Sequence, residues 1–144
     1  MSFGPLFEVN ALRRVAGDSV EEGREHLGLV KTHGLDETGV RRVRREAQAM
    51  GRLGDHHNVV SVYDVGQEAE DLYIVAQYMA GGDVQTLLQR AESHRLPVAE
   101  ALRIALDVCA ALDHAHERGV VHRDIKPGNV WLDADDEARL GDFG

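Results

Sequence analysis

The sequence His-Arg-Asp-Ile-Lys-Pro-Gly-Asn at residues 122–129 decides how the rest of the chain is interpreted. A second short sequence, Asp-Phe-Gly, follows at residues 142–144. Residues 130–141 between them are apolar at both ends and acidic in the centre, which predicts two short strands joined by a turn. Such a hairpin would bring Asn129 at its start close to Asp142 at its end.

The polar groups around this predicted hairpin suit the chemistry of phosphoryl transfer. The amide oxygen of Asn129 and the carboxylate of Asp142 are suitable ligands for Mg²⁺, which usually binds few protein oxygens together with substrate phosphates. Asp124 lies in a loop restricted by Pro127, where it can accept a proton from an incoming hydroxyl group. Lys126 can neutralise a phosphoryl group in transfer. A base, a cation and metal ligands are the groups that phosphoryl transfer requires.

The two sequences resemble the signature of protein kinases, His-Arg-Asp-x-x-x-x-Asn followed by Asp-Phe-Gly. The gap of 18 residues from Asp124 to Asp142 is ordinary for that family. Lys126 followed by Pro127 resembles the serine/threonine branch, because tyrosine kinases usually lack a lysine at this place. The resemblance implies that Asp124 is the catalytic base and that Lys126 steadies the γ-phosphate. It implies that Asn129 and Asp142 hold Mg²⁺.

The resemblance covers nearly all of residues 25–144 and implies an α+β, bilobal kinase fold that is incomplete. We expect a poorly defined segment over residues 1–24, an N-lobe over residues 25–79, and the hinge with the first part of the C-lobe over residues 80–144. The implied function is a serine/threonine protein kinase that uses ATP and Mg²⁺ and acts on protein substrates. The sequence stops before the family's activation segment, so we expect the 144-residue polypeptide alone to be marginally stable.

The family's lysine and glutamate that anchor ATP correspond to Lys31 and Glu46. Lys31 ends a predicted strand over residues 26–31, and it is either the anchor after a shortened loop or a surface lysine. Glu46 lies in a predicted helix over residues 36–51, and it is either the partner of the strand lysine or an i, i+4 partner of Arg42. The family's glycine-rich loop is not found in residues 1–24.

Two predicted strands over residues 59–65 and 72–79 lead into the sequence Ala-Gly-Gly-Asp at residues 80–83. This resembles the kinase hinge, with the small Ala76 at the gatekeeper position. The resemblance implies that backbone groups of Gln77 and Met79 bond to adenine. Asp83 is either a ribose contact, a helix N-cap, or both.

The longest predicted helix covers residues 97–118, and Gly119 ends it. A wide apolar stripe would normally pack against the rest of the kinase domain. The stripe comprises Leu102, Ala105, Leu106, Cys109, Leu112 and His116. We expect Cys109 to be a buried structural thiol, and we expect His114, His116 and His122 to be structural groups rather than metal ligands.

Composition agrees with a globular protein. Hydrophobic residues make up 43% and charged residues 28% of the chain. The net charge of −9 argues against nucleic acid or an anionic membrane surface as the main partner. The sequence has no apolar run long enough for a membrane span, and its N-terminus has no signal-peptide core. Both observations favour a cytoplasmic protein.

Two alternatives from other classes stay open. A catalytically inactive pseudokinase or interaction module is motivated by the missing glycine loop and the uncertain position of Lys31. A small-molecule phosphotransferase of similar fold usually carries His-Gly-Asp where this chain has His-Arg-Asp at residues 122–124.

Overall fold

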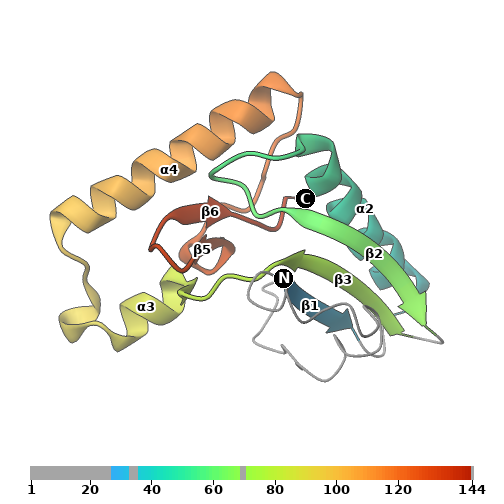
Figure 1. Cartoon of the computed structure of the whole chain (residues 1–144), viewed down its shortest axis with the longest axis horizontal. Helices are drawn as coiled ribbons and strands as arrows, with labels where there is room; N and C mark the ends of the chain where they lie inside the picture. The colour runs from blue at the N-terminus through green and yellow to red at the C-terminus, as the bar shows by residue number, and fades with distance from the viewer. Residues whose placement is uncertain (1–26, 33–35, 69–70, 144) are drawn as a thin grey trace.

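Two small antiparallel sheets organise the part of the chain that the structure describes, and a helix covers each of them (Figure 1). The computed structural model describes residues 27–32, 36–68 and 71–143. The first sheet has the strand order β1-β3-β2, and the second has the order β4-β5-β6. Each sheet has its own cluster of buried apolar side chains.

The first sheet is built from β1 (Leu27–Thr32), β2 (Val62–Glu68) and the central strand β3 (Asp71–Gln77). In the register of this sheet, Lys31 of β1 is opposite Tyr73 of β3. The predicted strand over residues 59–65 starts later than expected. Val59 and Val60 precede β2, and Val59 makes only an isolated bridge to Leu140 of the second sheet. Both valines are buried there, so their apolar character reflects contact with the second sheet rather than strand alternation.

Helix α2 (Glu37–Leu53) packs on the first sheet and confirms the helix predicted over residues 36–51. Asp36 caps its start, because the side-chain carboxylate accepts a hydrogen bond from the backbone N–H of Gly39 at 2.8 Å. Val43 and Ala47 are buried, and they form a cluster with Leu72 and Ile74 of β3. The apolar face thus holds the helix against the sheet, while its arginine-rich side faces solvent.

The second sheet contains β4 (Gly82–Asp83), β5 (Val130–Leu132) and β6 (Ala138–Leu140). Strands β5 and β6 form the hairpin that the sequence predicted. β4 follows directly after the link from the first sheet and pairs with β5. Gly81 in that link lies so close to β5 that an added Cβ would be 2.7 Å from the Cβ of Leu132. Only glycine allows this approach, which explains the residue at the bend.

Helix α3 (Val84–Arg90) follows β4, a short 3₁₀ turn (Glu92–His94) comes next, and α4 (Val98–Glu117) then runs along the second sheet (Figure 1). The long helix predicted over residues 97–118 is therefore confirmed. Gly119 ends it with a positive φ of 70°. Ile104, Ala111 and Ala115 of α4 are buried in the cluster that also contains Phe143.

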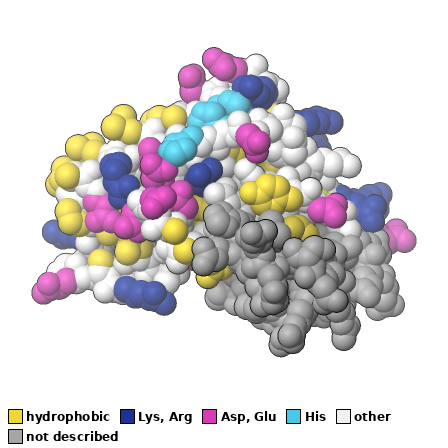
Figure 2. All heavy atoms as spheres, viewed as in Figure 1, with side chains coloured by type: hydrophobic (Ala, Val, Ile, Leu, Met, Phe, Trp, Pro, Cys, Tyr) yellow, Lys and Arg dark blue, Asp and Glu magenta, His cyan; other side chains and the backbone are white. Residues whose placement is uncertain are grey.

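Most of the apolar stripe predicted for α4 is exposed. Leu102 and Leu106 are 59% and 70% exposed, and Val98 at the start of the helix is 76% exposed. Figure 2 shows hydrophobic side chains along the margin of the molecule that α4 occupies. The prediction that Cys109 is buried was wrong, because this thiol lies on the same exposed face. In the described part of the chain, no helix is both long and apolar enough to span a membrane.

Candidate active site

The loop between α4 and β5 places two charged side chains next to each other. Lys126 Nζ lies 3.1 Å from Asp124 Oδ2, and both side chains are partly exposed. The hydrogen bond from Lys126 holds the pKa of Asp124 below its ordinary value, so this carboxylate is ionised at neutral pH. Arg123 has a positive φ of 70°, which turns the backbone sharply just before Asp124.

Asn129 fixes the position of Asp124 from the other end of the loop. A 3₁₀ turn (Pro127–Asn129) brings Asn129 back toward Asp124. The side-chain amide of Asn129 donates to the backbone carbonyl of Asp124 at 2.8 Å and to its carboxylate at 3.3 Å. Asn129 is completely buried, so this bond belongs to a rigid part of the loop.

His122 connects this loop to the segment that carries Asp142. Its Nε2–H donates to the backbone carbonyl of Gly141 at 2.6 Å, and its Nδ1 accepts from the backbone N–H of Asp124 at 3.1 Å. These two bonds define one neutral tautomer, and burial lowers the pKa of His122 in agreement with it. The ring also contacts Phe143 at a centroid distance of 4.7 Å. His122 is therefore a structural group, as the sequence predicted.

Two buried oxygen atoms at the ends of the hairpin lack a hydrogen-bond donor among the described residues. They are Asn129 Oδ1 and Asp142 Oδ2. Burial, with a smaller contribution from the negative charge of Glu46, raises the pKa of Asp142 from 3.8 to about 7. A buried carboxylate and a buried amide oxygen that both lack a partner are suitable ligands for a hard divalent cation. The residues present therefore fit the Mg²⁺ that the sequence predicted.

The described residues contain no cluster of three or more histidine, cysteine or acidic side chains suitable for a metal. A Mg²⁺ site does not require such a cluster, because Mg²⁺ takes one or two carboxylates and completes its shell with water and substrate phosphates. His114 bonds to the carbonyl of Leu53 at 2.7 Å, and its ring centroid lies 4.2 Å from that of His56.

Glu46 lies on α2 near enough to Asp142 to raise the pKa of that residue. Its carboxylate also pairs with Arg42 at 3.2 Å, so the i, i+4 interpretation of Glu46 is confirmed. The side chain of Lys31 lies outside the described residues. The pairing of Lys31 with Glu46 therefore stays a prediction, as does the part played by residues 1–24.

The predicted adenine-binding segment begins in β3 and ends at α3. Ala76 packs against the cluster between α2 and the first sheet. The backbone N–H of Gln77 donates to the carbonyl of Ser61 at 2.8 Å, and the carbonyl of Met79 accepts from the N–H of Gly82 at 3.1 Å. These two bonds hold the segment on both sides of its bend.

The structure confirms one of the two roles predicted for Asp83, that of helix N-cap. Its carboxylate accepts hydrogen bonds from the backbone N–H and the hydroxyl group of Thr86, both at 2.9 Å, and so caps α3. The ribose contact of Asp83 and the adenine contacts of Gln77 and Met79 stay predictions. Behind the segment, Gln77 lines a hollow of about 350 Å³ with Asp55, His56, His57, Ser61, Tyr63 and Arg139.

Two residues of α4 that contact the hairpin, Arg103 and Asp107, were not predicted from the sequence. Arg103 donates to the backbone carbonyl of Asp136, and Asp107 accepts from the backbone N–H of Ala138. The two side chains are four residues apart and therefore lie on one face of the helix. The spacing of Arg103 and Asp107 was visible in the sequence, but spacing alone does not identify the hairpin as the element that these side chains contact.

An ionised aspartate, an adjacent lysine and two buried oxygens without a donor among the described residues are the kinds of group that phosphoryl transfer requires. The family model described as "Protein kinase domain" matches residues 27–144. The chain belongs to the protein kinase family.

Several curated relatives carry the name of serine/threonine-protein kinases. PrkC of Bacillus subtilis is 40% identical over 109 residues, which cover 76% of this chain and 16% of the relative. PksC of Streptomyces coelicolor is 39% identical over 136 residues, or 90% of this chain and 24% of the relative. PknB of Mycobacterium leprae is 35% identical over 107 residues. The chain thus spans a quarter or less of the length of these relatives.

Proposed function

We propose that the intact protein transfers the γ-phosphoryl group of ATP to serine or threonine hydroxyl groups of a protein substrate. The observation that carries this proposal is the pair of buried oxygens on Asn129 and Asp142, which lack a donor among the described residues, beside the ionised Asp124. Membership in the protein kinase family and the names of the relatives support the same reaction.

In this proposal Asp124 orients the acceptor hydroxyl group and takes its proton, because its carboxylate is ionised and partly exposed. Lys126 contacts the transferred phosphoryl group from its position beside Asp124. Asn129 and Asp142 would hold Mg²⁺, which when bound neutralises charge on the phosphates. Asn129 has a second role here, because its amide keeps Asp124 in place.

The nucleotide would lie between the two sheets. Lys31 and Glu46 would anchor its phosphates, and Ala76 would leave space beside the adenine ring. Backbone groups of Gln77 and Met79 would bond to adenine. Asp83, at the start of α3, would reach the ribose. The bonds that hold Gln77 and Met79 in place support this arrangement, because a rigid segment loses little entropy on binding.

The proposed location is the cytoplasm, where ATP is available and an exposed thiol such as Cys109 stays reduced. The net charge of −9 argues against nucleic acid or an anionic membrane surface as a partner. We propose the division of the chain into an N-lobe over residues 25–79 and the start of a C-lobe over residues 80–144. The cluster of Val43, Ala47, Leu72 and Ile74 lies wholly within the proposed N-lobe and supports this division, while the other buried cluster takes Leu53 and Val59 from the N-lobe and so joins the two parts.

The test is transfer of radioactive phosphate from ATP to a general acceptor such as casein, with Asp124→Asn compared with Asp113→Asn. Asp113 is an exposed carboxylate of α4, six residues after Asp107. We expect Asp124→Asn to lower the rate by about 10²–10⁴-fold while ATP–Mg²⁺ affinity is retained. Asp113→Asn should leave the rate unchanged.

Two results would contradict the proposal. Binding of ATP–Mg²⁺ without any transfer by the unsubstituted protein would indicate a pseudokinase. Failure to bind nucleotide at all would indicate an interaction module.

A further inference from the structure

The outer edge of β6 is bonded to groups from outside the hairpin. β6 is an edge strand of the second sheet, because β5 lies between it and β4. Four of its backbone groups bond outward. The N–H and carbonyl of Leu140 bond to Asn58 and Val60, and the carbonyl of Ala138 accepts from the Asn58 amide at 3.0 Å. The remaining group is the N–H of Ala138.

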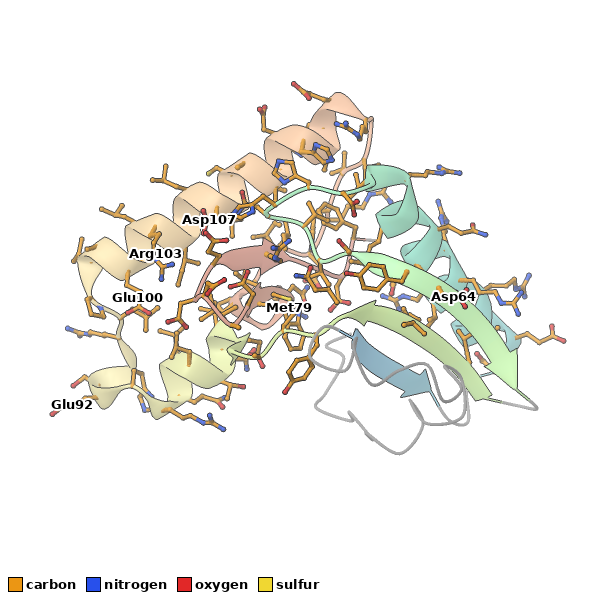
Figure 3. The ribbon with its side chains drawn as sticks, in the orientation of Figure 1. Asp64, Met79, Glu92, Glu100, Arg103 and Asp107 are labelled. Atoms are coloured by element: carbon orange, nitrogen blue, oxygen red, sulfur yellow. The ribbon has the colours of Figure 1, made fainter. Side chains whose placement is uncertain are left out.

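This last group is satisfied from α4. Asp107 Oδ2 accepts from the N–H of Ala138 at 3.1 Å, and Ala138 is fully buried. A hydrogen bond to a carboxylate is stronger than one between neutral groups. One helical turn earlier, Arg103 donates to the carbonyl of Asp136 in the hairpin turn. Figure 3 shows Arg103 and Asp107 on the side of α4 that faces the hairpin.

The hairpin needs this lateral support because its strands are short. β5 and β6 have three residues each, and a two-stranded ribbon of this length is not stable on its own. The pairing of Val130 with Leu140 and the bond from Gly141 N–H to the carbonyl of Asn129 set the separation of the two hairpin ends. A shift of β6 would therefore move Asp142 relative to Asn129.

We infer that Asp107 and Arg103 are positioning residues that hold β6, and through it Asp142, where the metal and the nucleotide phosphates bind. This inference rests on the proposed function, because it concerns the same metal site. Neither residue touches the substrate or the metal. Asp107 acts through the buried backbone of Ala138, and Arg103 acts through the hairpin turn.

The experiment measures Mn²⁺ binding, as a probe for the Mg²⁺ site, by electron paramagnetic resonance in the intact protein with ADP present. Asp107→Ala should weaken Mn²⁺ affinity about tenfold, at the low end for residues that support metal ligands. Asp107→Asn keeps an oxygen acceptor and should stay close to the unsubstituted protein. Arg103→Ala should give a smaller loss than Asp107→Ala. Asp113→Ala, which removes an exposed carboxylate from the same helix, should have no effect.

A second measurement separates positioning from general loss of structure. ADP affinity in EDTA should be the same in all variants, because the adenine and ribose contacts do not involve β6. An equal loss of metal-free ADP affinity and Mn²⁺ affinity in Asp107→Ala would overturn the inference. Unchanged Mn²⁺ affinity in Asp107→Ala would also overturn it. If Asp107→Ala does not fold, unchanged Mn²⁺ affinity in Arg103→Ala decides against the inference in the same way.

These results differ from failure of the proposed function. If the unsubstituted protein binds no Mn²⁺ with ADP, both the proposed function and the inference are overturned. If the unsubstituted protein binds and the variants match it, only the inference is overturned.

Discussion

Replacement of Asp142 by asparagine should stabilise the metal-free protein above neutral pH while it removes the proposed metal ligand. Burial raises the pKa of Asp142 from 3.8 to about 7. The folded state therefore binds a proton more tightly than the unfolded state does. Between pH 3.8 and about 7 the folded state carries more protons, so the contribution of Asp142 to stability falls as pH rises through this window.

The size of the effect follows from the two pKa values. Each tenfold difference in proton affinity corresponds to about 1.4 kcal/mol, so the ionised Asp142 costs the folded state about 4 kcal/mol above pH 7. Asparagine has nearly the same shape and no charge. The free energy of unfolding of Asp142→Asn should therefore exceed that of the unsubstituted protein by up to this amount at pH 8. At pH 4 the two proteins should differ little.

The assay is urea unfolding in EDTA from pH 4 to pH 8, with Asp113→Asn as the control for loss of an exposed charge. The comparison must be made between variants at each pH, because burial lowers the pKa values of His56 and His122. Those two groups make the folded state less stable as pH falls below 6.5, which opposes the trend from Asp142. A difference between Asp142→Asn and the unsubstituted protein that is constant over this pH range would refute the reasoning.

Three further predictions concern packing. Gly81→Ala should lower the free energy of unfolding by about 1–3 kcal/mol in a urea titration, because its Cβ would lie 2.7 Å from the Cβ of Leu132; an unchanged midpoint would contradict the close approach. Leu140→Ala should lower the free energy of unfolding by about 2–5 kcal/mol, since Leu140 is fully buried. Leu102→Ala, on the exposed face of α4, should lower it by less than about 0.5 kcal/mol. Equal losses in the two variants would show that this face is covered. Leu106→Gln should raise the concentration at which the 144-residue polypeptide aggregates in light scattering, because Leu106 is 70% exposed; an unchanged threshold would show that α4 is not the aggregating surface.

The parts of the site that lie close together in the sequence were predictable from it. Asp124, Lys126 and Asn129 share one loop, and the hairpin that follows could be inferred from its apolar ends and acidic centre. A short loop constrains its own geometry, so residue type and spacing carried most of the information about this part. The two side chains that the sequence proposed as metal ligands, Asn129 and Asp142, each have a buried oxygen without a donor among the described residues, and their binding of a metal stays a prediction.

The parts that depend on distant contacts were not predictable. Val59 and Val60 looked like strand residues, yet they are buried because they contact the second sheet. Cys109 looked like a core residue, but α4 places it on the exposed face. The role of Asp107 depends on a contact with Ala138, which is 31 residues away in the sequence. A periodic pattern shows that a helix has an apolar face, but it does not show which neighbour is present to cover that face.

The pairing of β4 with β5 has a consequence for the spacing of the whole site. β4 begins three residues after Met79, and β5 begins one residue after Asn129. Backbone hydrogen bonds across one small sheet therefore join the adenine end of the proposed site to its phosphate end. The sheet therefore fixes the distance between the proposed adenine contacts and the proposed phosphate contacts. A nucleotide with a different distance between its base and its phosphates could occupy one set of contacts but not both.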